Sequence, residues 1–425
     1  NDGGTLTANG STIVLSKTSG VLFSMGASAT FNAGTSTVMM NSDAAVTLVS
    51  GNVSFNDLTL SPTLTASQTY TFGTGTIAVN GDLDIDPDGG GSARTLTINL
   101  GDPLTIAGNF SLGGHNSGTT LLDTTSSNYA LTFPAVTINS GSTLTTRSSN
   151  VIITGTSGTL IDNTGTWTAK TGGTTTLSGN GDATLSSAAL TFSGLTLSGT
   201  GTKTLGAVTT AIGTVAFNNG SLDIGSGMTH SFGSFTSSAA TARVLTLNDS
   251  TINLTANGAA WTITSTNFTL NAGTSTIRYV NTTNNANTFT GGGLTYNNVW
   301  FDRGASTSNI TIAGSNTFAD FRDTGAAAHA LLFTAGTTNT FSTFTVSGTP
   351  GNLITINSTT TATHNLVKSG GGTIYCDYLD IQHSAASPAN TWYAGFSSIN
   401  NQAVATAGSG WIFSGPFNAL LIGGD

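Results

Sequence analysis

The segment with the clearest chemical potential is a run of aspartates at alternating positions. Residues 82–89 read Asp-Leu-Asp-Ile-Asp-Pro-Asp-Gly. A hard cation such as Ca²⁺ binds several carboxylate oxygens that converge in a turn, and this spacing matches the first half of a calcium-binding loop. The twelfth position of that loop holds Thr95 instead of Glu. We therefore expect one of two structures: a calcium site formed by Asp84, Asp86 and Asp88, or a strand whose aspartates face solvent.

A second candidate site is aromatic. The segment 375–425 is rich in Trp, Tyr and Phe, and Trp392, Tyr393 and Trp411 could stack on the sugar rings of a surface glycan if they are exposed. If they are buried, they would form a cap over the last turn of the fold, because an open end would leave strand edges unpaired. The exposure of these rings separates the two hypotheses.

Residues typical of enzymes are present but scattered. The five histidines, at positions 115, 230, 329, 364 and 383, lack the spacing of a metal site, and we expect them in turns or at the surface. One tight mixed-charge group, Asp320, Arg322 and Asp323, is interpreted as a solvated corner. A polysaccharide-degrading enzyme would need clustered carboxylates on one face. We therefore expect no catalytic residues and no resident cofactor other than the candidate calcium ion.

The composition indicates which elements position these residues. Only 7% of residues are charged, the 19 acidic residues are all Asp, and Lys and Arg together number 10. An amphipathic helix would lack residues for its polar face, whereas abundant Thr favours strands. The net charge of −9 and the absence of a basic cluster argue against nucleic-acid binding. No apolar run is long enough for a membrane-spanning helix, and Cys376, the single cysteine, cannot form an intramolecular disulfide.

Short strands with one apolar face recur along the chain. Apolar and polar residues alternate in segments such as 95–100, 195–197, 245–247, 310–312 and 354–356, and Gly, Asn and Ser clusters separate them.

The chain also repeats itself. Residues 232–248 align without gaps on 341–357, and the hexapeptide Asn-Ala-Gly-Thr-Ser-Thr occurs at 32–37 and at 271–276. A strand with one apolar face must stack on its equivalents to bury that face. We therefore predict an all-β parallel β-solenoid with degenerate coils of about 22 residues. Residues 1–374 would form the repeat region and 375–425 an aromatic-rich capping segment. Tandem β-sandwiches are the competing fold.

The C-terminal part of the chain resembles a known kind of protein. The segments 364–373, 376–381, 391–395 and 410–413 are similar to the closing module of repeat-built surface and fibre proteins from environmental bacteria and their phages. The likeness covers residues 317–413. It implies an extracellular, cell-surface or virion-fibre setting and assigns no catalytic residue.

These observations favour a structural function. We expect a non-enzymatic protein of an extracellular filament or a surface or phage fibre, which self-associates end to end. The apolar segment 419–422 would add a strand to a neighbour, and the first coil, which shows no cap, either follows further sequence or docks on another end. The alternatives are a monomeric adhesin that binds surface glycans, an ice-binding solenoid with rows of outward Thr, and a polysaccharide-degrading enzyme.

Overall fold

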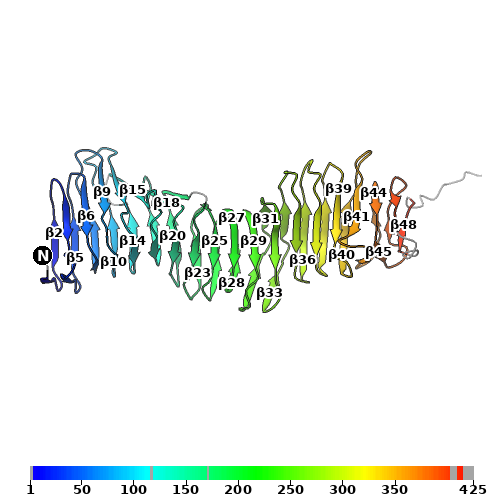
Figure 1. The fold of residues 1–425 in the computed structure, drawn as a ribbon, viewed down its shortest axis with the longest axis horizontal. Coiled ribbons are helices and arrows are strands. Elements are labelled where there is room, and N and C mark those ends of the chain that lie inside the picture. Colours follow the sequence, from blue (N-terminus) through cyan, green and yellow to red (C-terminus); the bar gives the residue numbers. More distant parts are fainter. Residues whose placement is uncertain (1–2, 115–117, 170–171, 403–408, 415–425) are drawn as a thin grey trace, which may run out of the picture. The chain divides into compact units, whose positions relative to one another are not determined.

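The protein is an all-β parallel β-solenoid of about 17 turns, whose equivalent positions lie about 23 residues apart (Figure 1). This computed structural model describes residues 3–114, 118–169, 172–402 and 409–414, and within these ranges no helix occurs. The predicted fold class is therefore confirmed, including the aromatic cluster near the C-terminus, and the coil is slightly longer than predicted.

The chain divides into two compact units, Asn1–Leu222 and Asp223–Asp425, each described below by itself. The expected division into a repeat region, 1–374, and a capping segment, 375–425, stays a prediction.

Unit 1 is built mainly from three parallel sheets, and most turns contribute one strand to each. The first contains β2 (Thr12–Leu15), β5 (Thr37–Met40), β8 (Asp57–Leu60), β11 (Leu83–Ile85), β14 (Asn109–Leu112), β17 (Ala135–Ile138), β20 (Thr159–Asn163), β23 (Ala183–Ser186) and β26 (Thr202–Thr204). The second contains β3 (Val21–Ser24), β6 (Val46–Ser50), β9 (Gln68–Phe72), β12 (Thr95–Asn99), β15 (Thr119–Asp123), β18 (Thr143–Arg147) and β21 (Thr166–Ala169). The third contains β7 (Val53–Phe55), β10 (Ile77–Val79), β13 (Leu104–Ile106), β16 (Leu131–Phe133), β19 (Val151–Ile153), β22 (Thr175–Leu177), β25 (Leu195–Leu197) and β27 (Thr209–Phe217). In the last turns β24 (Leu190–Phe192) and β25 both pair with β27. A short strand, β1 (Thr5–Thr7), pairs with β4 (Thr30–Asn32).

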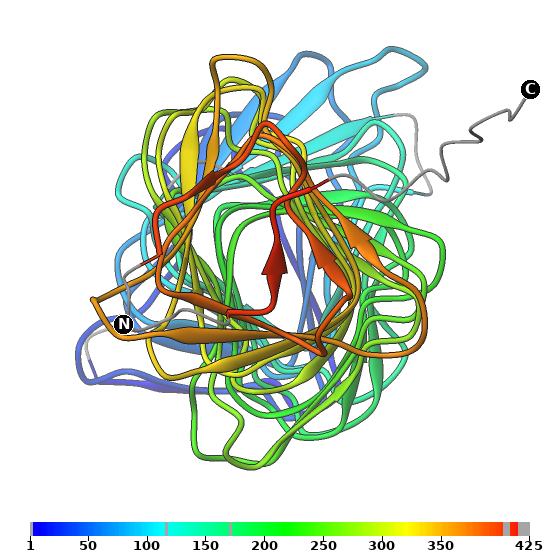
Figure 2. The same cartoon turned by 90° about the vertical axis from the view of Figure 1, so that its right-hand side faces the viewer.

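Unit 2 contains two long series of parallel strands, and β30 (Arg243–Thr246) pairs with β33 (Phe268–Asn271). One series is β29 (Thr229–Ser237), β31 (Thr251–Leu254), β34 (Thr276–Tyr279), β36 (Thr295–Phe301), β38 (Thr317–Asp323), β40 (Thr338–Val346), β42 (His364–Lys368) and β45 (Ser384–Ser387). The other is β32 (Gly258–Ile263), β35 (Asn287–Thr290), β37 (Ile310–Ala313), β39 (His329–Phe333), β41 (Ile354–Ser358), β44 (Leu379–Ile381) and β47 (Ile399–Asn400). Near the C-terminus β43 (Ile374–Tyr375), β46 (Trp392–Tyr393) and β48 (Trp411–Ile412) form a small third sheet. Figure 2 views the last turns end on, with β48 in red.

Each unit has a core made of stacked, inward-facing side chains. Because successive residues of a strand point to opposite faces and the strands pair in register, every second residue joins a ladder of equivalents inside the coil. One ladder of unit 1 is Val38, Leu58, Leu83, Phe110, Val136 and Ile161, all buried. One ladder of unit 2 is His230, Ile252, Ile277, Val299, Phe321 and Phe344, also buried. Burial of apolar area along such ladders is the main force that holds successive turns together.

The repeated hexapeptide forms the same corner in both units. In the first copy Gly34 has φ 60°, and the Thr35 amide donates to the carbonyl of Asn9 at 2.7 Å. In the second, Gly273 has φ 56°, and the Thr274 amide donates to the carbonyl of Asn248 at 2.7 Å. A Cβ at either glycine would collide with that asparagine carbonyl oxygen. Glycine is therefore required both by the positive φ and by the close approach of the preceding turn.

Turn length varies because the corners differ in length. Leu131 pairs with Val151, only 151 − 131 = 20 residues later, whereas Gln68 pairs with Leu96, 96 − 68 = 28 residues later. The strands nevertheless stay in register. The additional residues are therefore placed in the connections between strands and leave the core unchanged.

Candidate functional site

The aspartates of the predicted calcium site do not form a cluster. Asp84 lies on the outer face of β11, between Thr59 and Ser111 of the neighbouring strands. Asp86 is buried at 3% exposure, and Oδ1 of Asp88 accepts a hydrogen bond from the Gly90 amide at 2.9 Å. The described residues contain no group of three or more His, Cys or Asp side chains arranged to hold a metal ion. Calcium binding at Asp84, Asp86 and Asp88 stays a prediction.

Two of the three predicted glycan-binding rings lie inside the fold. Trp392 has no exposed surface and contacts Phe344 and Trp411, with ring centroids 5.5 and 5.1 Å away. Its Nε1 donates to the Ser387 carbonyl at 2.8 Å, and Nε1 of Trp411 donates to Oγ of Ser384 at 3.1 Å. Both indoles thus have the packing and the hydrogen-bonded N–H expected of core residues.

The third predicted ring is more accessible. Tyr393 packs against Tyr375 at 5.2 Å between ring centroids, and both line a hollow beside Phe396. Tyr375 and Phe396 are exposed. Of the three aromatic candidates, Tyr393 is therefore the one whose position allows contact with a ligand. The segment 419–422, predicted to add a strand to a neighbour, lies outside the described residues, as does the whole of 415–425.

The prediction that histidines occupy turns or the surface is wrong for three of them. His230, His329 and His364 are buried, because each lies at an inward position of a strand. Burial lowers the pKa of His230, whose Nε2 contacts the carbonyl of Ile224 at 2.8 Å. His383 is half-buried, and His115 lies outside the described residues.

The mixed-charge group is also not a corner. Asp320, Arg322 and Asp323 all belong to β38, and the strand separates them. Asp320 and Arg322 point outward, where they form an ion pair. Asp323 points inward and is buried beside His329, with Asp323 Oδ2 2.6 Å from His329 Nε2. Residues adjacent in sequence thus serve different sides of the sheet, as the alternation of a strand requires.

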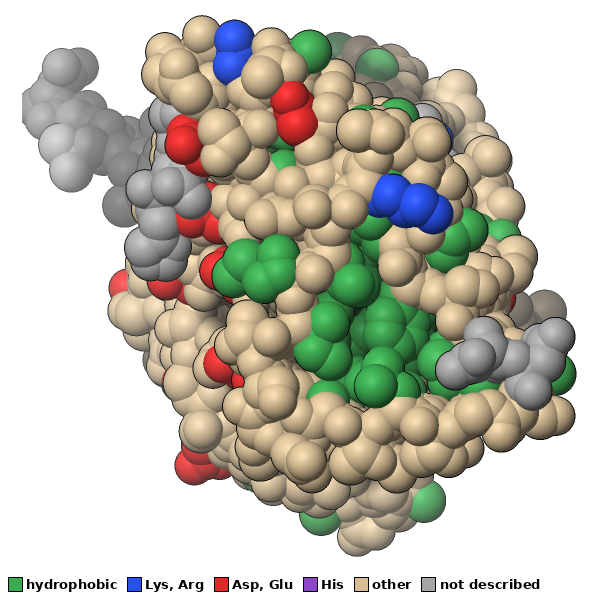
Figure 3. Space-filling view, turned by 90° about the vertical axis from the view of Figure 1, so that its left-hand side faces the viewer, with side chains coloured by type: hydrophobic (Ala, Val, Ile, Leu, Met, Phe, Trp, Pro, Cys, Tyr) green, Lys and Arg blue, Asp and Glu red, His purple; other side chains and the backbone are tan. Residues whose placement is uncertain are grey.

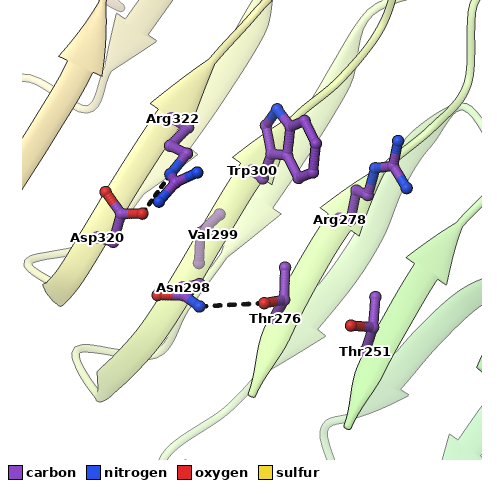
Figure 4. Close-up of a pocket in the computed structure, with 8 residues that line it drawn as sticks. All are labelled: Thr251, Thr276, Arg278, Asn298, Val299, Trp300, Asp320 and Arg322. Carbon is purple, nitrogen blue, oxygen red and sulfur yellow. Dashed lines mark hydrogen bonds and ion pairs between the residues drawn. The ribbon is translucent and has the colours of Figure 1, made fainter. Parts of the chain in front are cut away.

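The outer face of this sheet carries a hollow lined mainly by polar side chains. Two parallel rows of side chains cross it, each made of register partners on consecutive strands. One row is Asn253, Arg278, Trp300, Arg322 and Thr345. The other is Thr251, Thr276, Asn298, Asp320 and Thr343. Between them lies a hollow of about 190 Å³ (Figure 4).

Hydrogen bonds and ion pairs orient the groups around this hollow. The guanidinium of Arg278 lies 4.3 Å from the ring centroid of Trp300 and pairs with Asp302. Nε1 of Trp300 donates to Oγ1 of Thr324 at 2.8 Å. Figure 4 shows the indole projecting between Arg322 and Arg278. We refer to these residues around Trp300 as the Trp300 hollow.

The Asp320 side of the hollow is organised in the same way. Asp320 Oδ1 accepts from Oγ1 of Thr343 at 2.5 Å, while its other oxygen pairs with Nε of Arg322. Nδ2 of Asn298 donates to Oγ1 of Thr276 at 3.1 Å. The two arginines and the two aspartates, Asp302 and Asp320, cancel in charge. The hollow therefore combines an aromatic ring, fixed donors and fixed acceptors without a net charge.

Sequence reasoning did not find Trp300. The signal available was the run Val299-Trp300-Phe301, where three consecutive large apolar residues interrupt the alternation of a strand. Since Val299 and Phe301 are buried, the middle residue must point outward. An outward tryptophan beside Arg322 would have marked this face as more than a solvated surface.

Comparisons with known proteins do not identify the chain: no protein-family model, curated protein or solved structure matches it. In the described ranges no helix has the length and apolar character needed to cross a membrane.

Proposed function

We propose that the chain is a non-enzymatic structural protein of an extracellular filament or of a cell-surface or phage fibre, and that it associates end to end with other copies. The observation that carries this proposal is the in-register stacking of parallel turns, which gives each unit a core shared between successive turns. The low charge, the continuous parallel pairing and the C-terminal resemblance to surface and fibre proteins support the same function.

The first turn presents three strand edges on one end face. Among the described residues, β1, β2 and β3 each pair with a single strand, namely β4, β5 and β6. The opposite edge of each strand therefore leaves backbone N–H and C=O groups available to a further strand. Such edges recruit β-strands from other chains.

The end face is also apolar. Figure 3 shows hydrophobic side chains gathered at its centre and framed by polar ones. Leu6 is 49% exposed, and Ile13 and Leu15 remain partly exposed although their register partners Val38 and Met40 are fully buried. All three residues are thus more exposed than their register partners on the next turn.

A further β-solenoid turn fits this face, and in our proposal a second copy of the chain supplies it. A partner that satisfies three strand edges together must present three parallel strands in the same arrangement, as another β-solenoid turn does. Association of identical ends by rotation would close a dimer, whereas head-to-tail association would build a filament. We propose the head-to-tail arrangement because stacked parallel turns keep one direction.

Negative-stain electron microscopy of the purified chain at several concentrations tests this proposal. Uniform filaments that lengthen with concentration are expected. The double variant Ile13→Lys, Leu15→Lys should stop their growth, because two charges would be buried at each junction. Thr196→Lys, at an outward position of β25, is the matched control and should leave the filaments intact. Monomers at every concentration would count against the proposal.

A second candidate function is a glycan-binding adhesin that uses Tyr393. Its position beside Tyr375 and Phe396 favours this alternative. Tyr393→Ala should then weaken retention of the chain on glycan-coated surfaces while assembly is unchanged.

A further inference from the structure

Trp300 is the only one of the five tryptophans with an outward-facing side chain. Trp167, Trp261, Trp392 and Trp411 are all buried, at 7% exposure or less. Trp300, in contrast, occupies a position on β36 where neighbouring turns place residues such as Arg278 and Arg322. Its ring is only partly buried, so aromatic surface remains available for contact with a ligand.

The surroundings of Trp300 are unusual for this chain. Only 7% of all residues are charged, yet four charged side chains, Arg278, Asp302, Asp320 and Arg322, lie around one indole. Each is held by an ion pair or a hydrogen bond, so the groups need little further ordering when a ligand arrives. Such prior organisation reduces the entropic cost of binding.

We propose that the Trp300 hollow is a binding site for a neutral saccharide. A sugar ring has an apolar C–H face and a rim of hydroxyl groups that both donate and accept hydrogen bonds. The indole, over which Arg278 already lies, supplies its remaining aromatic surface for the ring. The guanidinium of Arg322 offers donors, while Oδ1 of Asn298 and the carboxylate of Asp320 offer acceptors to the hydroxyls.

The shape of the hollow fits an oligosaccharide better than a compact small molecule. Its volume of about 190 Å³ is below the range of roughly 300–1,000 Å³ typical of deep ligand pockets. Its lining residues come from four consecutive strands, β31, β34, β36 and β38. At about 4.8 Å between strands, these span roughly 14 Å. A short, extended glycan lying across the strands would meet both rows of side chains.

The charge balance selects a neutral glycan over an acidic one. Arg278 and Arg322 are already paired with Asp302 and Asp320. A sulfate or carboxylate would have to compete with these partners and would approach two fixed carboxylates. Hydroxyl groups, in contrast, can bind to the free lone pairs and N–H groups while both ion pairs remain in place.

Affinity electrophoresis of the full chain tests the proposal. The probes are the neutral polysaccharides dextran, mannan, xylan and hydroxyethyl cellulose, with polygalacturonate and dextran sulfate as acidic counterparts. At least one neutral probe should retard the chain, and the effect should change little between 50 and 500 mM NaCl. Trp300→Ala should weaken that binding at least tenfold, Arg322→Gln several-fold, and Trp300→Phe less than Trp300→Ala.

The control variant is Ile152→Ala, which truncates an exposed apolar side chain on the outer face of β19 and should bind like the wild type. Thermal unfolding of each variant confirms that it is folded. A second readout avoids substitutions: since the other tryptophans are buried, a bound glycan should protect the accessible fluorescence from acrylamide quenching. Retardation by acidic probes alone, by none of the probes, or equally for Trp300→Ala would overturn the proposal.

Binding at this site does not depend on assembly. Trp300→Ala should form the same filaments as the wild type, and Ile13→Lys, Leu15→Lys should bind the neutral probe as before. Loss of binding in Tyr393→Ala instead of Trp300→Ala would move the glycan site to the C-terminal aromatic residues and overturn the assignment made here.

Discussion

Nε2 of His329 lies 2.6 Å from Oδ2 of Asp323, and both side chains are buried. The other ring nitrogen, Nδ1, contacts the carbonyl oxygen of Ala327 at 2.8 Å. A carbonyl only accepts hydrogen bonds, so Nδ1 carries a proton, and a second proton on Nε2 allows the ring to donate to the carboxylate as well. His329 is thus placed to be an imidazolium inside the fold.

The first prediction concerns pH and His329. Burial lowers the pKa of His329, but the hydrogen bond and the charge of Asp323 outweigh it, and the pKa is raised overall. A histidine with a raised pKa in the folded state stabilises the fold fully below about pH 6.5, and this stabilisation is lost as the pH rises through the folded value. His329→Gln should lower the free energy of unfolding by about 3 kcal/mol at pH 6 and by less at pH 9. Urea unfolding at both pH values measures the difference; an equal cost at both would contradict the charged state.

The second prediction concerns His364, whose titration works in the opposite direction. Burial, with the nearby His383, lowers the pKa of His364 to about 3. Its ring stacks on Phe333 at 4.8 Å, and Nδ1 contacts Oγ of Ser358 at 3.0 Å. The unfolded chain binds a proton that the folded chain excludes, so stability falls as the pH drops below about 6.5 towards 3.

When the pH falls from 7.5 to 4.5, this histidine should lower the free energy of unfolding of the wild type by about 2–3 kcal/mol. His364→Leu removes the titrating group. Over the same pH interval, the unfolding free energy of the variant should therefore fall by about 2–3 kcal/mol less than that of the wild type. The quantity to compare is the change in unfolding free energy between the two pH values, since both proteins share the other titrating groups. Identical changes would show that His364 accepts a proton in the folded state.

The third prediction tests the stacked core. Phe321 contacts five other phenylalanine rings with centroids 5.2–6.4 Å away, in its own turn and in the turns on either side. Phe321→Ala should lower the free energy of unfolding by about 3–5 kcal/mol, because the cavity removes contacts in three turns. Thr345→Ala, on the outer face of β40, is the control and should stay within about 0.5 kcal/mol. Equal effects would mean that Phe321 does not hold the turns together.

The fourth prediction concerns a buried arginine that holds a corner. Arg303 is 2% exposed, and its guanidinium donates to the carbonyls of Asn281, Thr283, Asn285 and Ser308 and to Oγ of Ser306. Arg303→Gln leaves most of these acceptors without a donor. We therefore expect the free energy of unfolding to fall by about 3–5 kcal/mol. Hydrogen exchange should accelerate in residues 281–309 first. Lys17→Ala, at an exposed site, should leave exchange there unchanged.

The alternation of the sequence predicted the fold because it reflects the physical origin of the core. Leu96 and Ile98, or Ile310 and Ile312, were expected to face inward, and all four are buried. The register between distant turns was harder to predict from the sequence. His230 and Phe344 occupy one ladder, 344 − 230 = 114 residues apart. The gapless alignment of the sequence instead matches Phe235 to Phe344 at an offset of 109, but Phe235 lies in a different ladder, beside Trp261. Residues that match in sequence can thus belong to different ladders, and the alignment alone did not predict the register.

The polar residues were harder to place, because a charged side chain can lie on either face of a strand. Asp323 and Arg322 are neighbours in sequence, but Asp323 is buried with His329 and Arg322 is exposed beside Trp300. Their positions follow from the buried Phe321 by alternation. Phe318 is also buried, because the alternation of β38 is interrupted between these two residues, at Ala319 and Asp320. The Trp300 hollow depends on register between four strands, and register becomes visible only when the turns are stacked.

The unequal turns have a consequence for engineering and for divergence. The residues of a corner change the perimeter of a turn but not the spacing between stacked turns. A corner can therefore gain or lose residues while the ladders of the neighbouring turns remain aligned. Small insertions and deletions can therefore accumulate at the corners without disturbing the packing of the core. Their accumulation makes the repeat length irregular and the repeat hard to detect in the sequence. The same tolerance makes the corners suitable attachment points for grafted peptide epitopes, one for each successive turn within a unit.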